Sequence, residues 1–183
     1  MEENSNFGAL QCDLHTHSVF SDGTYTPTEI VAAASHLDLI VALTDHNTVD
    51  GLPSFLAAAQ NKPIEAIPGA EFSVDYQGKE LHIVALFLPE ESWPAVTQRL
   101  AQLHRDKEES NRALVAALQK GGYAISYEAV RAIAGGGWIN RAHVAQVLTQ
   151  KGYTASVKAA FATLLSRHGG YYVPPRLPDA LET

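Results

Sequence analysis

The first half of the chain alternates short apolar runs with helical patterns, and this alternation restricts the folds that it can adopt. Leu39–Thr44 is a continuous apolar run of strand length, as expected for a parallel strand that is buried on both faces. The other predicted strands are Leu10–His15, Ile64–Glu71 and Leu81–Leu88. Helical patterns follow the first and second strands, so the order of elements predicts an α/β fold with a largely parallel sheet.

The first of these helices has a recognisable beginning. Thr26-Pro27-Thr28-Glu29 matches a capping box, in which Thr26 is the N-cap, Pro27 takes the first helical position and the Glu29 side chain reaches back. A second helix is predicted at Leu52–Gln60. It precedes the third strand, which Pro68-Gly69 interrupts.

Beyond Pro89 the pattern becomes almost entirely helical. Residues 94–120 are predicted as one long helix that ends at Gly121-Gly122. Shorter helices are predicted at Tyr127–Ile133, Arg141–Gln150 and Ala155–His168. Residues 171–183 contain three prolines and no helical periodicity. We therefore expect an α/β part at residues 1–90, a helical insert at residues 91–170 and a tail at residues 171–183.

The net charge of −7 conceals a difference between the two halves. Residues 1–90 hold 13 acidic and two basic residues, a charge of −11, whereas residues 91–183 hold seven acidic and eleven basic residues, a charge of +4. An acidic half that is rich in histidine is typical of a cation site, and a basic half is typical of an anion site. Solvated charged helix faces would explain the same distribution.

The composition disfavours several classes of protein. No apolar run approaches the roughly 20 residues that a membrane span requires. The first ten residues have neither the basic start nor the apolar stretch of a secretory signal. Cys12 is the only cysteine, which excludes an internal disulfide and fits a reducing compartment. We therefore expect a cytoplasmic protein with no membrane association and no stable protein partner.

Histidine and carboxylate residues occur at or near the ends of all four predicted strands. His15 and His17 are two apart in an extended segment, so their side chains project to the same face. Glu71 ends the predicted third strand and His82 opens the fourth. In parallel α/β sheets the functional crevice lies at the carboxyl ends of the strands. The candidate site residues are His15, His17, Asp22, His46, Glu71 and His82.

Each of these residues has an ordinary explanation when it is taken singly. A lone buried histidine is more often a core residue than a ligand, and Asp22 suits a turn. Burying several imidazoles and carboxylates together is costly, however, unless they bind metal or pair. Nitrogen and oxygen donors without sulfur suit zinc, manganese or iron, and Glu71 could bridge two ions.

Four segments of the first half resemble a known family. They read CDLHTHSVFSDGTYTPTEIV, LIVALTDHNTVDG, IPGAEFS and LHIVALF. In order and spacing they are similar to the motifs of the PHP (polymerase and histidinol phosphatase) family. The resemblance implies a distorted (β/α)₇ barrel, similar to a TIM barrel, that holds two or three divalent metal ions at the carboxyl ends of its strands.

The resemblance also implies roles for individual residues. The implied ligands are His15, His17 and Glu71 for one ion, Glu71 and His82 for a second, and Asp22 and His46 for a third. Asp22, His46 and Glu71 are the residues that we expect to be catalytic.

The helical insert resembles one branch of this family. SNRALVAAL, NRAHVAQVL, GYTASVKAAFATLL and GYYVP are similar to the branch that hydrolyses nucleoside 3′,5′-bisphosphates. Members of that branch are also credited with trimming the 5′ ends of short RNA. A small phosphorylated nucleotide, or short RNA, is therefore the expected substrate.

Five polar residues of the insert are candidates for binding that substrate. Asn140, Arg141 and His143 lie at a predicted helix start after a triple-glycine loop, where backbone N–H groups and a guanidinium would receive phosphate. Arg105 and Arg112 lie seven residues apart on the long helix and face the same side. A helix cap and a charged outer face would explain the same residues.

These observations predict a metal-dependent phosphoesterase that removes phosphate from a small nucleotide with metal-activated water. No G-x-S-x-G motif occurs and Cys12 precedes no helix, which disfavours a covalent intermediate. The alternatives are a 5′-to-3′ exoribonuclease acting on short RNA and a non-catalytic remnant that binds metal or nucleotide. Histidinol phosphate is disfavoured as a substrate because the helical insert resembles the nucleotide branch of the family. Trp138 suits either stacking on a base or packing within the fold.

The resemblance implies a longer pattern than the one present here. Four strands cannot close a barrel of seven. The family pattern continues with a strand that ends in His-Pro and a later one that carries Asp-x-His. We expect these 183 residues to be the truncated N-terminal part of such a barrel, which binds metal weakly and is nearly inactive alone. Roughly 90–100 further residues should restore both properties.

Overall fold

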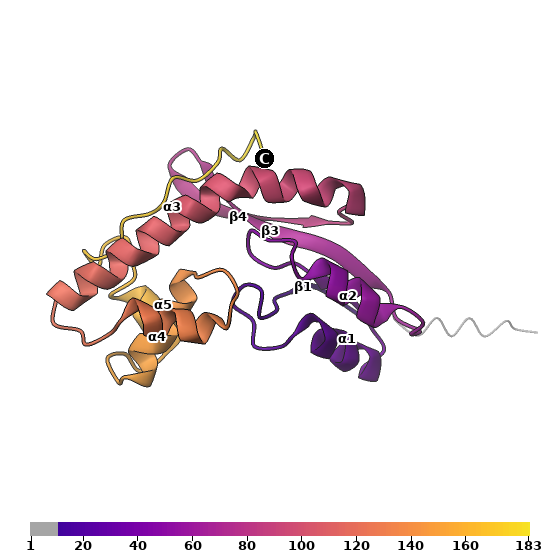
Figure 1. Ribbon diagram of the computed structural model, residues 1–183, viewed down its shortest axis with the longest axis horizontal. Helices are drawn as coiled ribbons and strands as arrows, with labels where there is room; N and C mark the ends of the chain where they lie inside the picture. The colour runs from indigo at the N-terminus through magenta and orange to yellow at the C-terminus, as the bar shows by residue number, and fades with distance from the viewer. Residues whose placement is uncertain (1–10) are drawn as a thin grey trace, which may run out of the picture.

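The computed structural model describes residues 11–183 and contains one four-stranded sheet (Figure 1). Its strands lie in sequence order, as β1 (Gln11–Thr16), β2 (Leu39–Leu43), β3 (Ala66–Tyr76) and β4 (Lys79–Leu86). β1, β2 and β3 are mutually parallel where they pair, and β4 is antiparallel to β3. The prediction of an α/β fold with a largely parallel sheet is confirmed, although the predicted strand start at Leu10 lies outside the described residues.

Two helices connect the parallel strands. α1 (Pro27–His36) begins with the predicted capping box, in which the Thr26 side chain accepts a hydrogen bond from the Glu29 N–H and the Glu29 carboxylate accepts one from the Thr26 N–H. α2 (Leu52–Ala59) follows β2. Both helices pack into a core on the sheet that includes Val31, Leu43 and Phe55.

The third and fourth strands differ from the prediction. β3 continues five residues beyond Glu71 to Tyr76, so Glu71 lies within the strand and does not end it. Gln77 and Gly78 both have positive φ, of 53° and 79°, which suits a two-residue hairpin turn. β4 therefore folds back antiparallel on β3, and His82 lies in the middle of β4, opposite Ser73.

The second half contains four helices in the described part of the chain. They are α3 (Trp93–Lys120), which follows a 3₁₀ turn at Glu90–Ser92, α4 (Tyr127–Ala134), α5 (Arg141–Gln150) and α6 (Val157–Ala162). α6 is shorter than the predicted Ala155–His168 because the chain turns after Ala162, where Thr163 and Ser166 hydroxyls bond to nearby carbonyls. A second hydrophobic core joins these helices, and Leu114, Val144 and Leu148 are fully buried in it.

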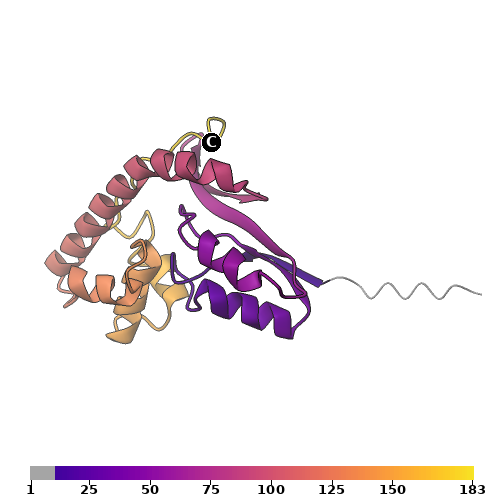
Figure 2. The same ribbon diagram turned by 45° about the vertical axis from the view of Figure 1, so that its right-hand side comes forward.

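The long helix α3 links the two cores (Figures 1 and 2). Its beginning lies beside the sheet, where Trp93 packs into the first core, and its end lies beside α4 and α5. The tail runs back along α3, where the Ser110 hydroxyl donates to the Val173 carbonyl, and reaches the hairpin end of β3 at Asp75. The sheet is curled, and its closure into a barrel stays a prediction, as does the division into domains.

Within residues 11–183, no helix combines the length and the apolar character that crossing a membrane requires. The longest, α3, has 28 residues but carries charged side chains along much of its length.

We expect Leu114→Ala to destabilise the chain strongly, because Leu114 is fully buried in the second core. Truncating a buried leucine costs about 2–5 kcal/mol through lost burial and the cavity left behind. Leu37→Ala is the matched control, since Leu37 is 60% exposed. Urea unfolding followed by circular dichroism measures both variants. Equal stability of the two would contradict the described packing of the helices.

Candidate metal centre

The loop after β1 is held in place by a buried carboxylate, that of Asp45. Asp45 follows β2 and is 2% exposed. It accepts hydrogen bonds from the Ser18 N–H at 2.7 Å, the Ser18 hydroxyl at 2.6 Å and the Ser21 hydroxyl at 2.6 Å. These bonds fix the segment that carries His17 and Asp22, so Asp45 orients two of the predicted ligands while lying outside the set itself.

The loop after β2 is fixed against β3 in a similar way. Asn47 adopts a positive φ of 54°, a conformation that asparagine tolerates better than most residues. Its N–H donates to the Glu71 carbonyl at 2.8 Å, and its side chain exchanges hydrogen bonds with Ser73. The Glu71 N–H donates to the Asp45 carbonyl. As a result, His46 lies directly beside Glu71 on the neighbouring strand.

Two glycines allow the close approaches that this arrangement needs. A Cβ atom on Gly23 would lie 2.0 Å from the His17 carbonyl oxygen, so the turn between these residues closes only with glycine. A Cβ atom on Gly69 would lie 2.6 Å from the Ala85 carbonyl oxygen of β4. Gly69 therefore permits the close approach of the β3 and β4 backbones.

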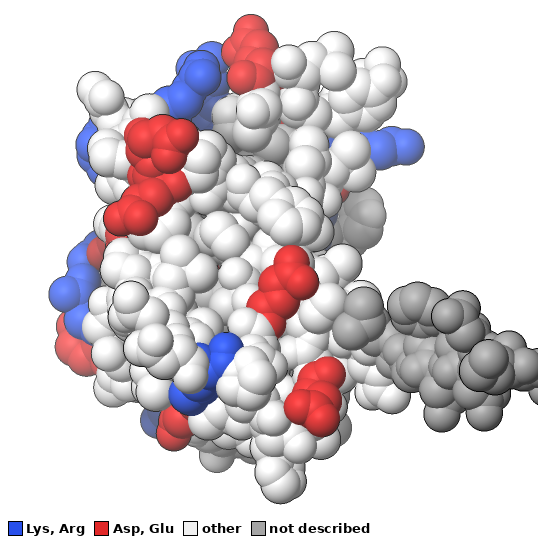
Figure 3. All heavy atoms as spheres, turned by 90° about the vertical axis from the view of Figure 1, so that its right-hand side faces the viewer, with Lys and Arg blue, Asp and Glu red and all other residues white. Residues whose placement is uncertain are grey.

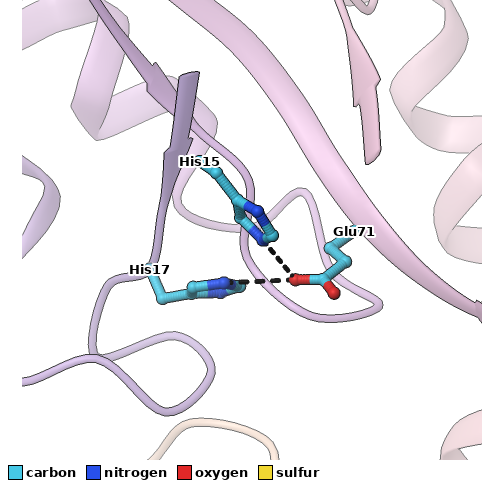
Figure 4. A group of neighbouring side chains, drawn as sticks. All are labelled: His15, His17 and Glu71. Carbon is cyan, nitrogen blue, oxygen red and sulfur yellow. Dashed lines mark hydrogen bonds and ion pairs between the residues drawn. The ribbon is translucent and has the colours of Figure 1, made fainter. Parts of the chain in front are cut away.

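The Glu71 carboxylate lies at the centre of the site and is 5% exposed. Its Oε2 atom lies 2.7 Å from His15 Nε2 and 3.1 Å from His17 Nε2, and Figure 4 shows both imidazoles pointing at it from β1 and the following loop. Its Oε1 atom lies 2.7 Å from His82 Nδ1. His46 Nδ1 lies 3.5 Å from Oε2. One buried carboxylate therefore meets four imidazoles.

Asp22 adds a second carboxylate at the edge of this group. Its two oxygens lie 3.7 Å from His17 Nδ1 and 3.8 Å from His46 Nε2. The rings of His17 and His46 are stacked, with centroids 4.6 Å apart. The structure thus brings all six predicted residues into one cluster.

Three overlapping sets within the cluster have donor atoms within 4.8 Å of one another. They are His15, His17 and Glu71; His17, Asp22 and His46; and His46, Glu71 and His82. All donors are imidazole nitrogens or carboxylate oxygens, which suits zinc, manganese or iron. The residues present therefore fit a centre with more than one divalent ion.

Burial and neighbouring charges set the protonation of this cluster. Burial lowers the pKa of His46 to about 4, against the opposing effect of Asp22 and Glu71. Burial acts to raise the pKa of Glu71, but the hydrogen bond from His15 and the charges of His46 and His82 outweigh it, so the pKa is lowered. At neutral pH, Glu71 is ionised and His46 is neutral, which are the forms that bind metal.

His82 is the exception among these groups. The Glu80 carboxylate, 3.6 Å from His82 Nε2, raises the pKa of His82, and Glu71 acts in the same direction, while burial opposes both. Glu80 itself has a pKa lowered to about 2, chiefly by the adjacent His82 imidazole. A carboxylate on each side of His82 orients its ring, as is usual around histidine ligands.

A cavity of about 130 Å³ lies between this cluster and the helices of the second half. Asp22, His46 and His82 line it from the cluster, and Lys107, Asn140, Arg141 and Tyr172 line it from the other side. A larger groove of about 820 Å³ lies between α3 and the tail, but of the six candidate ligands none lines it. Of these two, only the smaller cavity borders the cluster.

Two cations face the smaller cavity. The Arg141 guanidinium lies over the Tyr172 ring, 4.1 Å from its centroid, and 3.3 Å from the Glu80 carboxylate. Lys107 Nζ donates to the Ser73 hydroxyl at 2.9 Å. Burial lowers the pKa of Lys107 to about 8, in spite of the nearby Glu80 charge. An anion beside the cluster would meet positive charge from both residues.

The other predicted substrate residues are engaged in other contacts. Asn140 lines the cavity but its side chain caps α5 by accepting from the Ala142 N–H, and His143 is 4% exposed and accepts from the Asn140 N–H. On the outer face of α3, Arg105 binds Gln102 and Arg112 binds Glu108. Neither of these arginines lines the cavity, so their role in binding stays a prediction without a supporting contact.

Sequence reasoning missed Lys107, Glu80 and Asp45. Lys107 offered a signal, because its spacing from Leu103 and Leu114 places it on the buried stripe of α3. Asp45 also offered a signal, because it is a carboxylate at the end of an apolar strand. Glu80 offered no signal, since the direction of its side chain depends on the β3–β4 register.

Several known proteins are similar to this chain in sequence or in fold. The model of the PHP domain matches residues 13–173. The chain is 33% identical over 175 residues to a 5′-3′ exoribonuclease of Haemophilus influenzae, covering 93% of this chain and 63% of that protein. It is 33% identical over 156 residues to a 3′,5′-nucleoside bisphosphate phosphatase of Chromobacterium violaceum, covering 84% of this chain and 54% of that protein.

A solved structure from Bifidobacterium adolescentis, provisionally described as a metal-dependent phosphoesterase, superimposes with a TM-score of 0.86. It is 27% identical, and the match covers 93% of this chain and 60% of that one. The chain therefore spans little more than half the length of these three proteins.

Asp45→Asn should weaken metal binding although it removes none of the predicted ligands. The amide loses the charge that holds the Ser18 and Ser21 groups, so the loop that carries His17 and Asp22 is less well fixed. Loss of such supporting contacts typically lowers metal affinity about 10- to 100-fold. Calorimetric titration with Mn²⁺ measures the effect, with the exposed Glu65→Gln as control. Unchanged affinity would show that the loop does not depend on Asp45.

Proposed function

Because this chain belongs to the PHP domain family, we propose that it carries the metal-binding part of an enzyme that removes a phosphate from a small nucleotide. The observation that carries the proposal is the position of the Glu71 cluster. It shares one cavity with Lys107 and Arg141, so a divalent metal centre and a phosphate-binding pair of cations would meet in the same place. This combination suits a phosphoesterase.

The cluster would hold two or three divalent ions. Glu71 is suited to bridge two of them, because each of its oxygens faces a different imidazole at 2.7 Å. The ligand sets would be His15, His17 and Glu71, then Glu71 and His82, then Asp22 and His46. When bound, such ions lower the pKa of water and offset the charge on phosphate oxygens.

The chain's own residues would position the substrate. Arg141 presents a planar guanidinium that can bind two phosphate oxygens at once, and its place over Tyr172 limits its movement. Lys107 adds a compact charge from the facing helix. Both cations are partly buried beside the cluster, which reduces their screening by solvent.

A 5′-3′ exoribonuclease is the second candidate, because the relative in Haemophilus influenzae bears that name. Such an enzyme requires a path along which positive charge follows the strand. On the face shown in Figure 3, acidic and basic side chains of the described residues are interspersed. On this face the described residues form no continuous basic path for a strand.

We expect the double variant His15→Ala/His17→Ala to lose most of its bound metal while keeping its fold. Both imidazoles point at Glu71 from β1 and its loop, and the sheet does not need them in order to form. Metal analysis after equilibrium dialysis against Zn²⁺ gives the result, with circular dichroism as a check on folding. His36→Ala/His168→Ala is a matched control because both histidines are exposed. Full metal content in the first variant would exclude these ligands.

The choice of substrate is tested by single turnovers, with the chain in excess and Mn²⁺ present. We expect a low rate of phosphate release, fastest from a nucleoside 3′,5′-bisphosphate and slower from a short 5′-phosphorylated RNA or from histidinol phosphate. A chelator should abolish release. Faster attack on the RNA would favour the exoribonuclease, and metal-bound protein without any release would indicate a binding-only role.

Nucleotide affinity should fall as the pH rises through about 8, the value to which burial lowers the pKa of Lys107. A phosphate monoester is already dianionic there, since its second pKa is about 6, so the change reflects the protein. Below this pH Lys107 is charged, and above it the positive charge is lost. Lys107→Arg keeps its charge and should bind with little pH dependence. The AMP affinity of the unmodified chain and of Lys107→Arg is measured against pH at constant Mn²⁺. The same pH dependence in both would exclude Lys107 as the titrating group.

A further inference from the structure

The two tryptophans of the chain differ sharply in their surroundings. Trp93 is 9% exposed and packs in the core on the sheet. Trp138 is 43% exposed, between the glycine loop that follows α4 and the start of α5. A single exposed aromatic side chain is common on protein surfaces, so exposure alone does not indicate a binding role for Trp138. The fixed orientation of its ring and its location do.

The Trp138 ring is held by two different segments. It stacks on His104 of α3, with ring centroids 3.7 Å apart and an interplanar angle of 23°. Its Nε1–H donates to the Asp50 carboxylate at 3.4 Å. His104 is itself 8% exposed and donates from Nε2 to the Asn47 carbonyl at 2.6 Å. One face of the indole is covered and its rotation is restricted.

The same ring lies beside the metal cluster. A small hollow is lined by Trp138 and His104 together with His46 and Lys107. Asn47, which holds His104, directly follows His46 in sequence and binds the Glu71 backbone. The indole is therefore tied to the segment that positions the cluster.

The loop before Trp138 packs closely against the loop after β1. A Cβ atom on Gly137 would lie 2.5 Å from the Val19 carbonyl oxygen, in the loop after β1 that carries Asp22. This contact places the residue before Trp138 directly against the loop that bears a predicted ligand. The position of the indole relative to the cluster is thus set by backbone packing.

We propose that Trp138, backed by His104, is a stacking platform for the nucleobase of the substrate. This inference rests on the proposed function, since it requires a nucleotide whose phosphate lies at the cluster. A ring whose orientation is already fixed loses little entropy when a base stacks on it. Stacking on an indole uses the π-face that every base has, so the platform accepts purines and pyrimidines without reading their edges.

Fluorescence tests the platform without requiring catalysis. Trp138 and Trp93 are the only tryptophans, and a base stacked on Trp138 should quench its emission saturably. We expect quenching by AMP and none by ribose 5-phosphate, which carries the phosphate without a base. Trp138→Leu leaves Trp93 as the only emitter and should show no saturable change with AMP. Saturable quenching that persists in Trp138→Leu would overturn the proposal.

Affinities measured by calorimetry in the presence of Mn²⁺ give an independent test. Trp138→Leu should weaken AMP about tenfold, within the range measured for base–aromatic stacking, and leave ribose 5-phosphate and Mn²⁺ unchanged. Trp138→Phe should retain most of the AMP affinity. Phe87→Leu is a control at another aromatic residue, which is 66% exposed. Phe87 lines neither the cavity beside the cluster nor the hollow beside Trp138.

Two results separate this proposal from the proposed function. If AMP and ribose 5-phosphate bind equally and Trp138→Leu changes neither, the platform is wrong and the phosphate site stands. If Mn²⁺ binds but neither phosphate compound does, the proposed function fails together with the platform. An equal loss of both ligands in Trp138→Leu would assign Trp138 a structural role and overturn the platform.

Discussion

The Glu71 carboxylate is the group on which the rest of the site depends. A carboxylate that is 5% exposed is costly unless several donors or cations surround it. Here the donors come from β1, the loop after it, the loop after β2, and β4. These segments meet only because Asp45 and Asn47 fasten the two loops to β3 and to one another. The fold of the first half thus serves to gather imidazoles around one strand.

The second half supplies the opposite charge. α3 and α5 place Lys107 and Arg141 across a small cavity from the cluster, and Glu80 holds Arg141 while it also binds His82. The division of charge between an acidic first half and a basic second half therefore has a structural meaning at this cavity. The candidate metal ligands face cations that are suited to phosphate, which is the arrangement that the proposed reaction requires.

The sequence allowed the elements of the sheet and all six cluster residues to be predicted, because apolar runs and motif spacing are local features. It placed Glu71 and His82 at strand ends, whereas both lie within strands and meet through the register of a hairpin, which is not visible locally. His143 was predicted to bind substrate; its side chain caps α5 and is buried, so that role stays a prediction without a supporting contact. Lys107 was missed because a charged residue on a helix is expected to face solvent unless the packing is known.

Anomalous diffraction from crystals of the chain grown with Zn²⁺ tests the central claim most directly. We expect peaks within about 2.0–2.2 Å of the Glu71 oxygens and of the neighbouring imidazole nitrogens, the usual zinc distances. One peak should lie between Glu71, His15 and His17, and another between Glu71 and His82. Zinc found only at exposed histidines, with Glu71 still hydrogen-bonded to His15 and His82, would contradict the account.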